Sequence, residues 1–471
     1  MRLSFAALAA AVPTAMMLAP VCGLTPGAER AAVPDLIVTA APAYAPLAEL
    51  RGQERFPKGA QLLLVHAGKA EPLVAGFAAS ADANVSFDGQ TVLFAGKQTA
   101  GDPWQIWELT LKDRSVRKVI ATNGDAERPL YLPGGRMVWA QRTATGFQAQ
   151  SAEDGHPENV RILNPTAGPG VLPLTDLRAS AFPADVLQDG RILFEAGYPL
   201  GEGSTPELFL VYADGSGVES VRCDHGRARW GGTQLASGDV VFTHGASLAR
   251  FTSPLAHEAP VAAPGGAYAG AIAETASGEW LVSVKAGTDA RYTIKIWKPG
   301  ATAMRMVLRV NGEDLVEPVV IAPRTKPNRH PSGLHPWNYA NLLALDARVS
   351  RDGALKGTPA TVRMESQDAA GHAVPMGTAP IEKDGSFFVQ VPGDRPIRFE
   401  LLDFKGTVLR QEHGWFWARG GEQRICVGCH AGPERGSENR VPAVLMKTTT
   451  PVDLTGAKKA AAGETAGQGG R

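Results

Sequence analysis

Apolar runs in the first two-thirds of the chain recur behind short glycine-centred turns. The turns lie at Gly89, Gly135, Gly190, Gly238 and Gly278, and each is followed at once by β-branched, aromatic or other apolar residues. Asp-Gly and Ser-Gly turns supply the positive φ that tight hairpins demand, and the runs behind them have the composition of buried strands. The pattern therefore predicts β-hairpins at intervals between about residues 60 and 322.

The spacing of these turns is that of a repeat architecture. Successive glycines are 46, 55, 48 and 40 residues apart, a period typical of propeller blades. The runs resemble the TolB-type propeller repeat, so we interpret residues 59–322 as an all-β β-propeller of six or seven blades. One or two blades would come from weaker patterns near residues 60–80 and 303–322. The alternative is a large β-sandwich with coincidental spacing.

A second domain is predicted behind a proline-rich linker. Residues 323–339 contain four prolines and no periodicity, and strand-like runs bounded by turns follow at 361–364, 385–391 and 397–402. This spacing favours a small antiparallel β-sandwich. We assign it residues 340–454.

One motif in the second domain carries cofactor chemistry. Cys426 and Cys429 are three residues apart, and His430 follows directly. On one side of a helical turn both thiols can add to the vinyl groups of a haem, while the adjoining imidazole reaches the iron. The motif predicts one covalently bound haem c with His430 as the proximal iron ligand. A zinc site or a redox dithiol is the alternative, although no second cysteine pair and no βαβ pattern accompanies the motif.

The remaining haem contacts are expected upstream of the motif. Only 41 residues follow His430, so the pocket must be built largely from earlier segments. Trp415 and Trp417 are the expected walls, because a porphyrin needs large flat apolar neighbours, although either could instead be sandwich core. His413, beside them, is the expected distal ligand, and an open iron position is the alternative. The other side chains able to reach the distal side are His330, His335 and Met446.

The N-terminus predicts export. Arg2 precedes an apolar stretch from residue 5 to 18, as in a secretory signal, so we read residues 1–24 as a signal peptide and 25–58 as a linker. The expected compartment is the periplasm. A retained anchor, or a lipid on Cys22, is the alternative and would be the chain's only contact with a membrane.

Composition narrows the classes of function. The chain has 47 basic and 47 acidic residues and no basic run, which argues against nucleic acid as a partner. Four cysteines in 471 residues are too few for a disulfide framework. Cys223 is expected to be a small buried residue. The tail, residues 455–471, is rich in glycine, alanine and lysine and is expected to be disordered.

The order of short motifs between about residues 384 and 454 resembles one known family. Asp-Gly-Ser-Phe-Phe, Val-Pro-Gly-Asp-Arg-Pro, Trp-Phe-Trp and the cysteine motif follow in turn, and then Glu-Asn-Arg-Val-Pro. This is similar to the middle domain of the hydrazine synthase alpha subunit, in which a TolB-like propeller precedes a sandwich with one c-type haem. The resemblance also implies a tyrosine as axial ligand four residues beyond the motif histidine. Glu434 stands there, so His430 remains the expected ligand.

Two functions follow as hypotheses. The first is an exported c-type haem protein for electron transfer or small-molecule redox chemistry, with a redox protein or a small molecule as its partner. The ligand at the sixth iron position decides between these two chemistries. If a protein side chain occupies that position, the iron cannot bind a small molecule and can only transfer electrons. The alternative is a non-enzymatic propeller scaffold with a structural metal at the cysteine motif.

Overall fold

The structure, a computed structural model, describes most of the chain between residues 33 and 456. The described residues are 33–120, 122–143, 146–153, 172–173, 175, 180–200, 205–222, 224–254, 256–287, 290–329, 331–350, 353–368, 370–428 and 439–456, with backbone only for 146–153 and 172–173. The predicted signal peptide, Cys223, Cys429 and His430 lie outside them. No helix among the described residues is long and apolar enough to span a bilayer.

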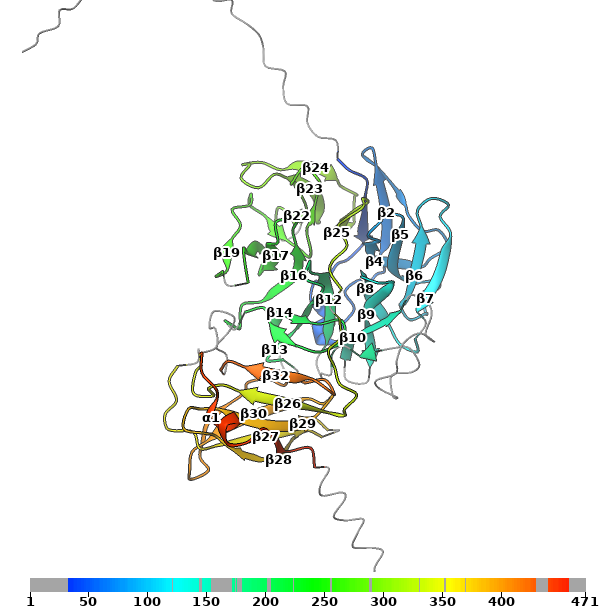
Figure 1. The fold of residues 1–471 in the computed structure, drawn as a ribbon. Coiled ribbons are helices and arrows are strands. Elements are labelled where there is room, and N and C mark those ends of the chain that lie inside the picture. Colours follow the sequence, from blue (N-terminus) through cyan, green and yellow to red (C-terminus); the bar gives the residue numbers. More distant parts are fainter. Residues whose placement is uncertain are drawn as a thin grey trace, which may run out of the picture. The chain divides into compact units, whose positions relative to one another are not determined.

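The first domain is a β-propeller (Figure 1). Its described residues form six antiparallel sheets, numbered here as blades I to VI, each containing hairpins of strands that neighbour one another in sequence. Blade I has the order β25-β1-β2-β3 and contains β1 (Leu36–Ala41), β2 (Gln61–His66), β3 (Lys69–Pro72) and β25 (Asp314–Val320). Blade II contains β4 (Ala79–Val85), β5 (Thr91–Lys97), β6 (Gln105–Thr110) and β7 (Val116–Ile120).

Blades III to VI follow in chain order. Blade III contains β8 (Ala126–Leu132), β9 (Arg136–Thr143), β10 (Gly146–Glu153) and β11 (Leu172–Pro173). Blade IV contains β12 (Ala181–Val186), β13 (Ile192–Tyr198), β14 (Thr205–Val211) and β15 (Glu219–Ser220). Blade V contains β16 (Arg229–Gln234), β17 (Val240–His244), β18 (Ser247–Phe251) and β19 (Ala259–Pro260). Blade VI contains β20 (Ala267–Tyr268), β21 (Ala273–Glu274), β22 (Trp280–Lys285), β23 (Thr293–Trp297) and β24 (Arg305–Leu308).

The predicted glycine turns each lie at a hairpin of blades II to VI. All five turn glycines have positive φ, between 73° and 92°. At Gly89 a side chain is excluded twice, because a Cβ atom would also lie 2.9 Å from the backbone nitrogen of Pro323. The repeat interpretation is confirmed, since every turn connects strands of one blade.

Blade I closes the ring with strands from both ends of the domain. β1 pairs with β2 on one side and with β25 on the other, and all six of its residues are buried. The linker predicted for residues 25–58 is therefore wrong over its described part, which also contains a short 3₁₀ helix, η1 (Ala48–Arg51). The weak patterns near 60–80 and 303–322 complete one blade between them, because the first supplies β2 and β3 and the second supplies β25.

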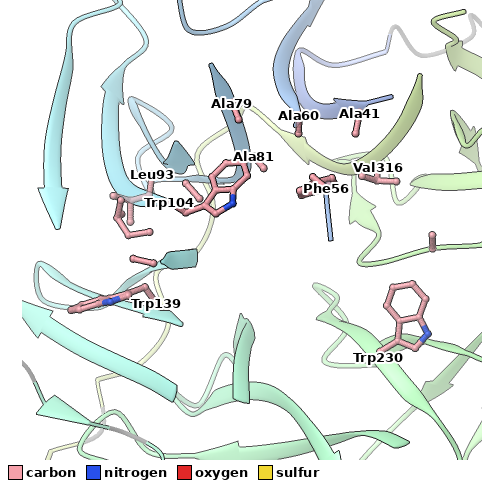
Figure 2. Close-up of a cluster of buried hydrophobic side chains, with 14 of the residues drawn as sticks. Ala41, Phe56, Ala60, Ala79, Ala81, Leu93, Trp104, Trp139, Trp230 and Val316 are labelled. Atoms are coloured by element: carbon pink, nitrogen blue, oxygen red, sulfur yellow. The ribbon is translucent and has the colours of Figure 1, made fainter. Parts of the chain in front are cut away.

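The propeller interior combines an apolar cluster with a buried ionic network. Phe56, Trp104, Trp139 and Trp230 come from four different blades and pack together with small alanines (Figure 2). The guanidinium of Arg55 lies over the ring of Phe56, 4.6 Å from its centroid. Its nitrogens form ion pairs with three buried or half-buried carboxylates, from Glu49, Asp82 and Glu317.

The second domain is a sandwich of two four-stranded sheets. Sheet 1 has the order β32-β26-β29-β33 and contains β26 (Tyr339–Ala344), β29 (Phe387–Pro392), β32 (Gln423–Cys426) and β33 (Val452–Asp453). Sheet 2 has the order β28-β27-β30-β31 and contains β27 (Thr361–Gln367), β28 (Ala373–Pro380), β30 (Ile397–Leu402) and β31 (Val408–Gln411). A single helical turn, α1 (Ala443–Lys447), precedes β33.

Sheet 1 differs from the antiparallel sandwich that the sequence predicts. β32 runs parallel to β26, and β33 runs parallel to β29, so both edge pairings are parallel. Parallel neighbours need long crossover connections, and both edge strands come from the C-terminal part of the domain, far from their partners in sequence. Hairpin signals predict local antiparallel pairs only, which is why this arrangement was missed.

The proline-rich segment is an ordered loop on the propeller. The backbone nitrogen of Arg324 donates to the carbonyl of Phe87 over 2.9 Å, and that of Asn328 donates to the carbonyl of Gln188 over 3.1 Å. These bonds hold the segment against the hairpin turns of blades II and IV. β26 begins at its end, with Tyr339.

Candidate functional site

Blade IV and the second domain share several hydrogen bonds. The backbone nitrogen of Trp415 donates to the carbonyl of Leu200 over 2.7 Å. The backbone nitrogen of Gly217 donates to Oε1 of Glu422 over 3.2 Å. The first bond joins backbone to backbone, and the second joins the backbone of blade IV to a side chain of the second domain.

A cavity lies at this contact. Its empty space, including the solvent at its open mouth, is about 1120 Å³. Residues of both sandwich sheets line it, among them Leu342, Met364, Phe387, Phe399, Phe416 and Cys426. Blade IV and the loop behind it supply Tyr198, Leu200, Phe209, Val218 and His225.

The cavity wall is mainly aromatic and aliphatic. Phe399 and Phe416 meet edge to face with ring centroids 6.2 Å apart. The guanidinium of Arg424 lies over the Phe416 ring, 5.5 Å from its centroid, and donates to the carbonyls of Trp417 and Val218. The wall therefore presents flat apolar surfaces and one fixed cation.

Cys426 reaches this cavity from sheet 1. It is the last residue of β32, where it pairs with Ala344, and it is a half-buried free cysteine. Burial raises the pKa of its thiol above the ordinary value, although Arg424 opposes this shift. Gly428, the residue before Cys429 in the sequence, also lines the cavity. The described start of the motif thus lies at the cavity wall.

The two tryptophans predicted as haem walls have different surroundings. Trp415 lines the cavity, with the guanidinium of Arg398 over its ring at 4.4 Å. Trp417 is not among the lining residues. It is fully buried in the core of blade IV, where its indole nitrogen donates to the carbonyl of Gly215 over 3.0 Å. Both tryptophan side chains are almost fully buried, so they differ in their neighbours rather than in their exposure.

The predicted distal candidates are not among the described residues that line the cavity. His413 is exposed, and its Nδ1 lies 3.3 Å from the hydroxyl of Tyr198. His335 is exposed and stacks on Trp337 with centroids 4.3 Å apart. Met446 is 76% exposed, and His330 lies outside the described residues. None of the described three is among the lining residues.

The comparisons with known proteins concern first the domain that contains the cysteine motif. Residues 340–431 match the family model of the hydrazine synthase alpha subunit middle domain. The second domain is hydrazine synthase alpha-like. The match begins inside β26 and ends just past the motif, so it includes all strands of sheet 2, three of the four strands of sheet 1 and the segment that carries Cys426.

The fold of the whole chain agrees with this finding. Hydrazine synthase from Kuenenia stuttgartiensis has a similar structure with a TM-score of 0.75, covering 88% of this chain and 71% of that one at 17% identity. TolB from Acinetobacter baumannii has a TM-score of 0.45, covering 61% of this chain and 66% of that one at 13% identity. The comparison with curated proteins finds no match. The described part of the chain is thus a propeller followed by a domain that is similar to the hydrazine synthase alpha subunit middle domain.

Sequence reasoning missed the propeller's share of the site. Tyr198, Phe209 and His225 line the cavity, but they precede the motif by about two hundred residues. They belong to an ordinary blade and the loop behind it, and no short motif marks them. Large apolar side chains near the motif in sequence are a signal for wall residues, but this signal identifies residues of the second domain only.

Proposed function

We propose that this protein is an exported c-type haem protein that carries one haem, bound through Cys426 and Cys429, and uses it for redox chemistry. The observation that carries the proposal is the position of Cys426 on the wall of an aromatic cavity between two β domains. A half-buried thiol at the start of a Cys-x-x-Cys-His sequence has the chemistry needed for a thioether to a haem vinyl group.

The residues around the cavity fit such a group. Trp415, Phe399 and Phe416 offer flat apolar faces for a porphyrin. Arg424, which also lines the cavity, offers a cation for a propionate. When bound, the haem supplies one-electron chemistry, and the protein supplies the apolar surroundings and the axial ligands that set its potential.

Export belongs to the same proposal. Residues 1–24 have the pattern of a secretory signal, and we infer that haem attachment takes place in the periplasm. The partner would be a redox protein or a small molecule at the open mouth of the cavity. His430 is proposed as the proximal iron ligand, because it adjoins Cys429 in the motif.

The test is covalent haem on the full-length protein. Produced in a bacterial host with periplasmic cytochrome-maturation machinery, the denatured protein should keep its haem stain on a gel. The double variant Cys426→Ala, Cys429→Ala should lose the stain, because both thioether positions are gone. The matched control Cys223→Ala should keep it. A colourless product that contains zinc would overturn the proposal.

A further inference from the structure

A histidine of the propeller lines the same cavity as Cys426. His225 lies in the loop between β15 and β16 and is half-buried. Its imidazole ring stacks on the ring of Tyr198 with centroids 4.0 Å apart and planes 9° from parallel. Tyr198 lines the cavity as well. The imidazole therefore belongs to the wall that blade IV contributes, and a flat neighbour sets the orientation of its plane.

The residues on both sides of His225 are anchored to buried charged side chains. The nitrogens of Gly226 and Arg227 donate to Oε1 of Glu207 over 2.7 and 3.1 Å. On the other side, the carboxylate of Asp224 accepts a bond of 2.8 Å from Arg229. The Glu207 and Arg229 side chains are each only 1% exposed. This anchoring fixes the loop at the residues that flank the histidine.

His225 has the properties expected of a metal ligand, because its imidazole lies at the cavity wall and its neighbours fix its orientation. Imidazole is the commonest protein ligand of transition metals, and a ligand's neighbours orient its ring and tune the metal. His413 differs, because its side chain is exposed and, although its Nδ1 lies 3.3 Å from the hydroxyl of Tyr198, it is not among the residues that line the cavity. The two histidines thus contact the same tyrosine, and only His225 lines the cavity.

We propose that His225 is the distal axial ligand of the haem iron, completing the coordination begun by His430. The inference rests on the proposed haem function. One domain would supply the thioethers and the proximal histidine, and the propeller would supply the sixth ligand. Two protein ligands leave no open iron position, so the site would pass electrons rather than activate a small molecule. The propeller then takes part directly in the redox centre.

The test uses the full-length haem-loaded protein, once covalent haem has been shown by the stain. The oxidised wild type should be low-spin, with the electron paramagnetic resonance signature of two imidazole ligands, and the reduced form should resist carbon monoxide. His225→Ala should become high-spin and take up carbon monoxide at once. The matched control His413→Ala should keep the wild-type spectrum.

A second variant keeps the test possible if the alanine variant does not fold. His225→Met keeps a ligand of suitable length, so the haem should stay low-spin, gain the long-wavelength sulfur-to-iron band, and shift to a higher reduction potential. A histidine with a purely structural role would give none of these changes. A wild-type haem that is high-spin, or a His225→Ala protein that stays low-spin, would overturn the inference while leaving the haem proposal standing. Absence of the haem stain would instead reject the proposed function.

Discussion

The interior of the propeller and the cavity at blade IV both contain polar groups, but these groups are arranged in opposite ways. In the propeller, Arg55 pairs with Glu49, Asp82 and Glu317. Arg128 adds bonds to Glu49 over 2.7 Å and to Glu195 over 3.0 Å. At the cavity, by contrast, Cys426 and His225 face a common space whose wall is mostly apolar.

The protonation of the propeller network follows from its burial. Burial raises the pKa of Glu127 well above its ordinary value, with neighbouring Glu49 adding to the shift. Burial acts in the same direction on Glu49, but Arg128 and Arg55 outweigh it and hold the pKa of Glu49 at about 2. Charges that neutralise one another in this way hold strands together. The cavity's polar groups instead converge on a space, which is the arrangement of a binding site.

The largest expected effect comes from breaking the propeller network. Arg55→Met keeps the aliphatic stem but leaves three carboxylates without their shared cation, so the free energy of unfolding should fall by about 3–5 kcal/mol. Denaturant unfolding measures this. The control Arg114→Met, at an exposed pair with Glu71, should change it by less than about 0.5 kcal/mol. Equal losses in the two variants would mean that the buried network contributes no more than a surface pair.

An intermediate effect is expected at the contact between blade IV and the second domain. Trp417→Phe removes the indole donor and leaves the carbonyl of Gly215 buried without that bond, which should lower the free energy of unfolding by about 1–3 kcal/mol. The partly exposed Trp337 offers a control, because Trp337→Phe should stay within about 0.5 kcal/mol of the wild type. A neutral Trp417→Phe would show that the interface does not depend on this bond.

A smaller effect is expected from pH. Burial, only partly opposed by Arg55, raises the pKa of Glu317 from 4.5 to about 7. The folded protein then holds this proton at pH values where the unfolded chain has lost it. The stabilisation is therefore complete below the unfolded pKa and is lost as pH rises through the folded one.

The expected loss is on the order of 1 kcal/mol between about pH 5 and pH 8, because Glu317 keeps some exposure to water. Unfolding measured across this range should show the decline in the wild type. Glu317→Gln, which cannot titrate, should show a weaker decline over the same range. A wild type that becomes more stable toward pH 8, relative to that variant, would contradict the raised pKa.

The smallest effect is expected at the C-terminus. A chain that ends at Gly456 should keep its haem and unfold within about 0.5 kcal/mol of the full-length protein. A shorter chain that ends at Thr450 provides the comparison. It lacks β33 and the buried Leu454, so its free energy of unfolding should fall by about 1.5–3 kcal/mol. Loss of haem on the shorter deletion of residues 457–471 would show that the tail is structural.

Much of the fold could be predicted from the sequence. The positions of five blades followed from glycine turns, because a positive φ and the apolar run behind it are local requirements that each hairpin meets by itself. The strands β27, β29 and β30 of the second domain followed from the same kind of signal. The family resemblance was also readable, since it depends on short motifs in order, and the match to residues 340–431 confirms it.

What the sequence by itself determined is therefore local: hairpins, blade period, and the spacing of Cys426, Cys429 and His430. Only the tertiary structure decided how distant segments meet. It placed β1 between β2 and β25, sent Trp417 into blade IV, and brought His225 to the cavity of a domain that begins more than a hundred residues later. These contacts depend on packing between segments far apart in the chain, and no local pattern of turns or apolar residues encodes which distant surface a strand or loop will face.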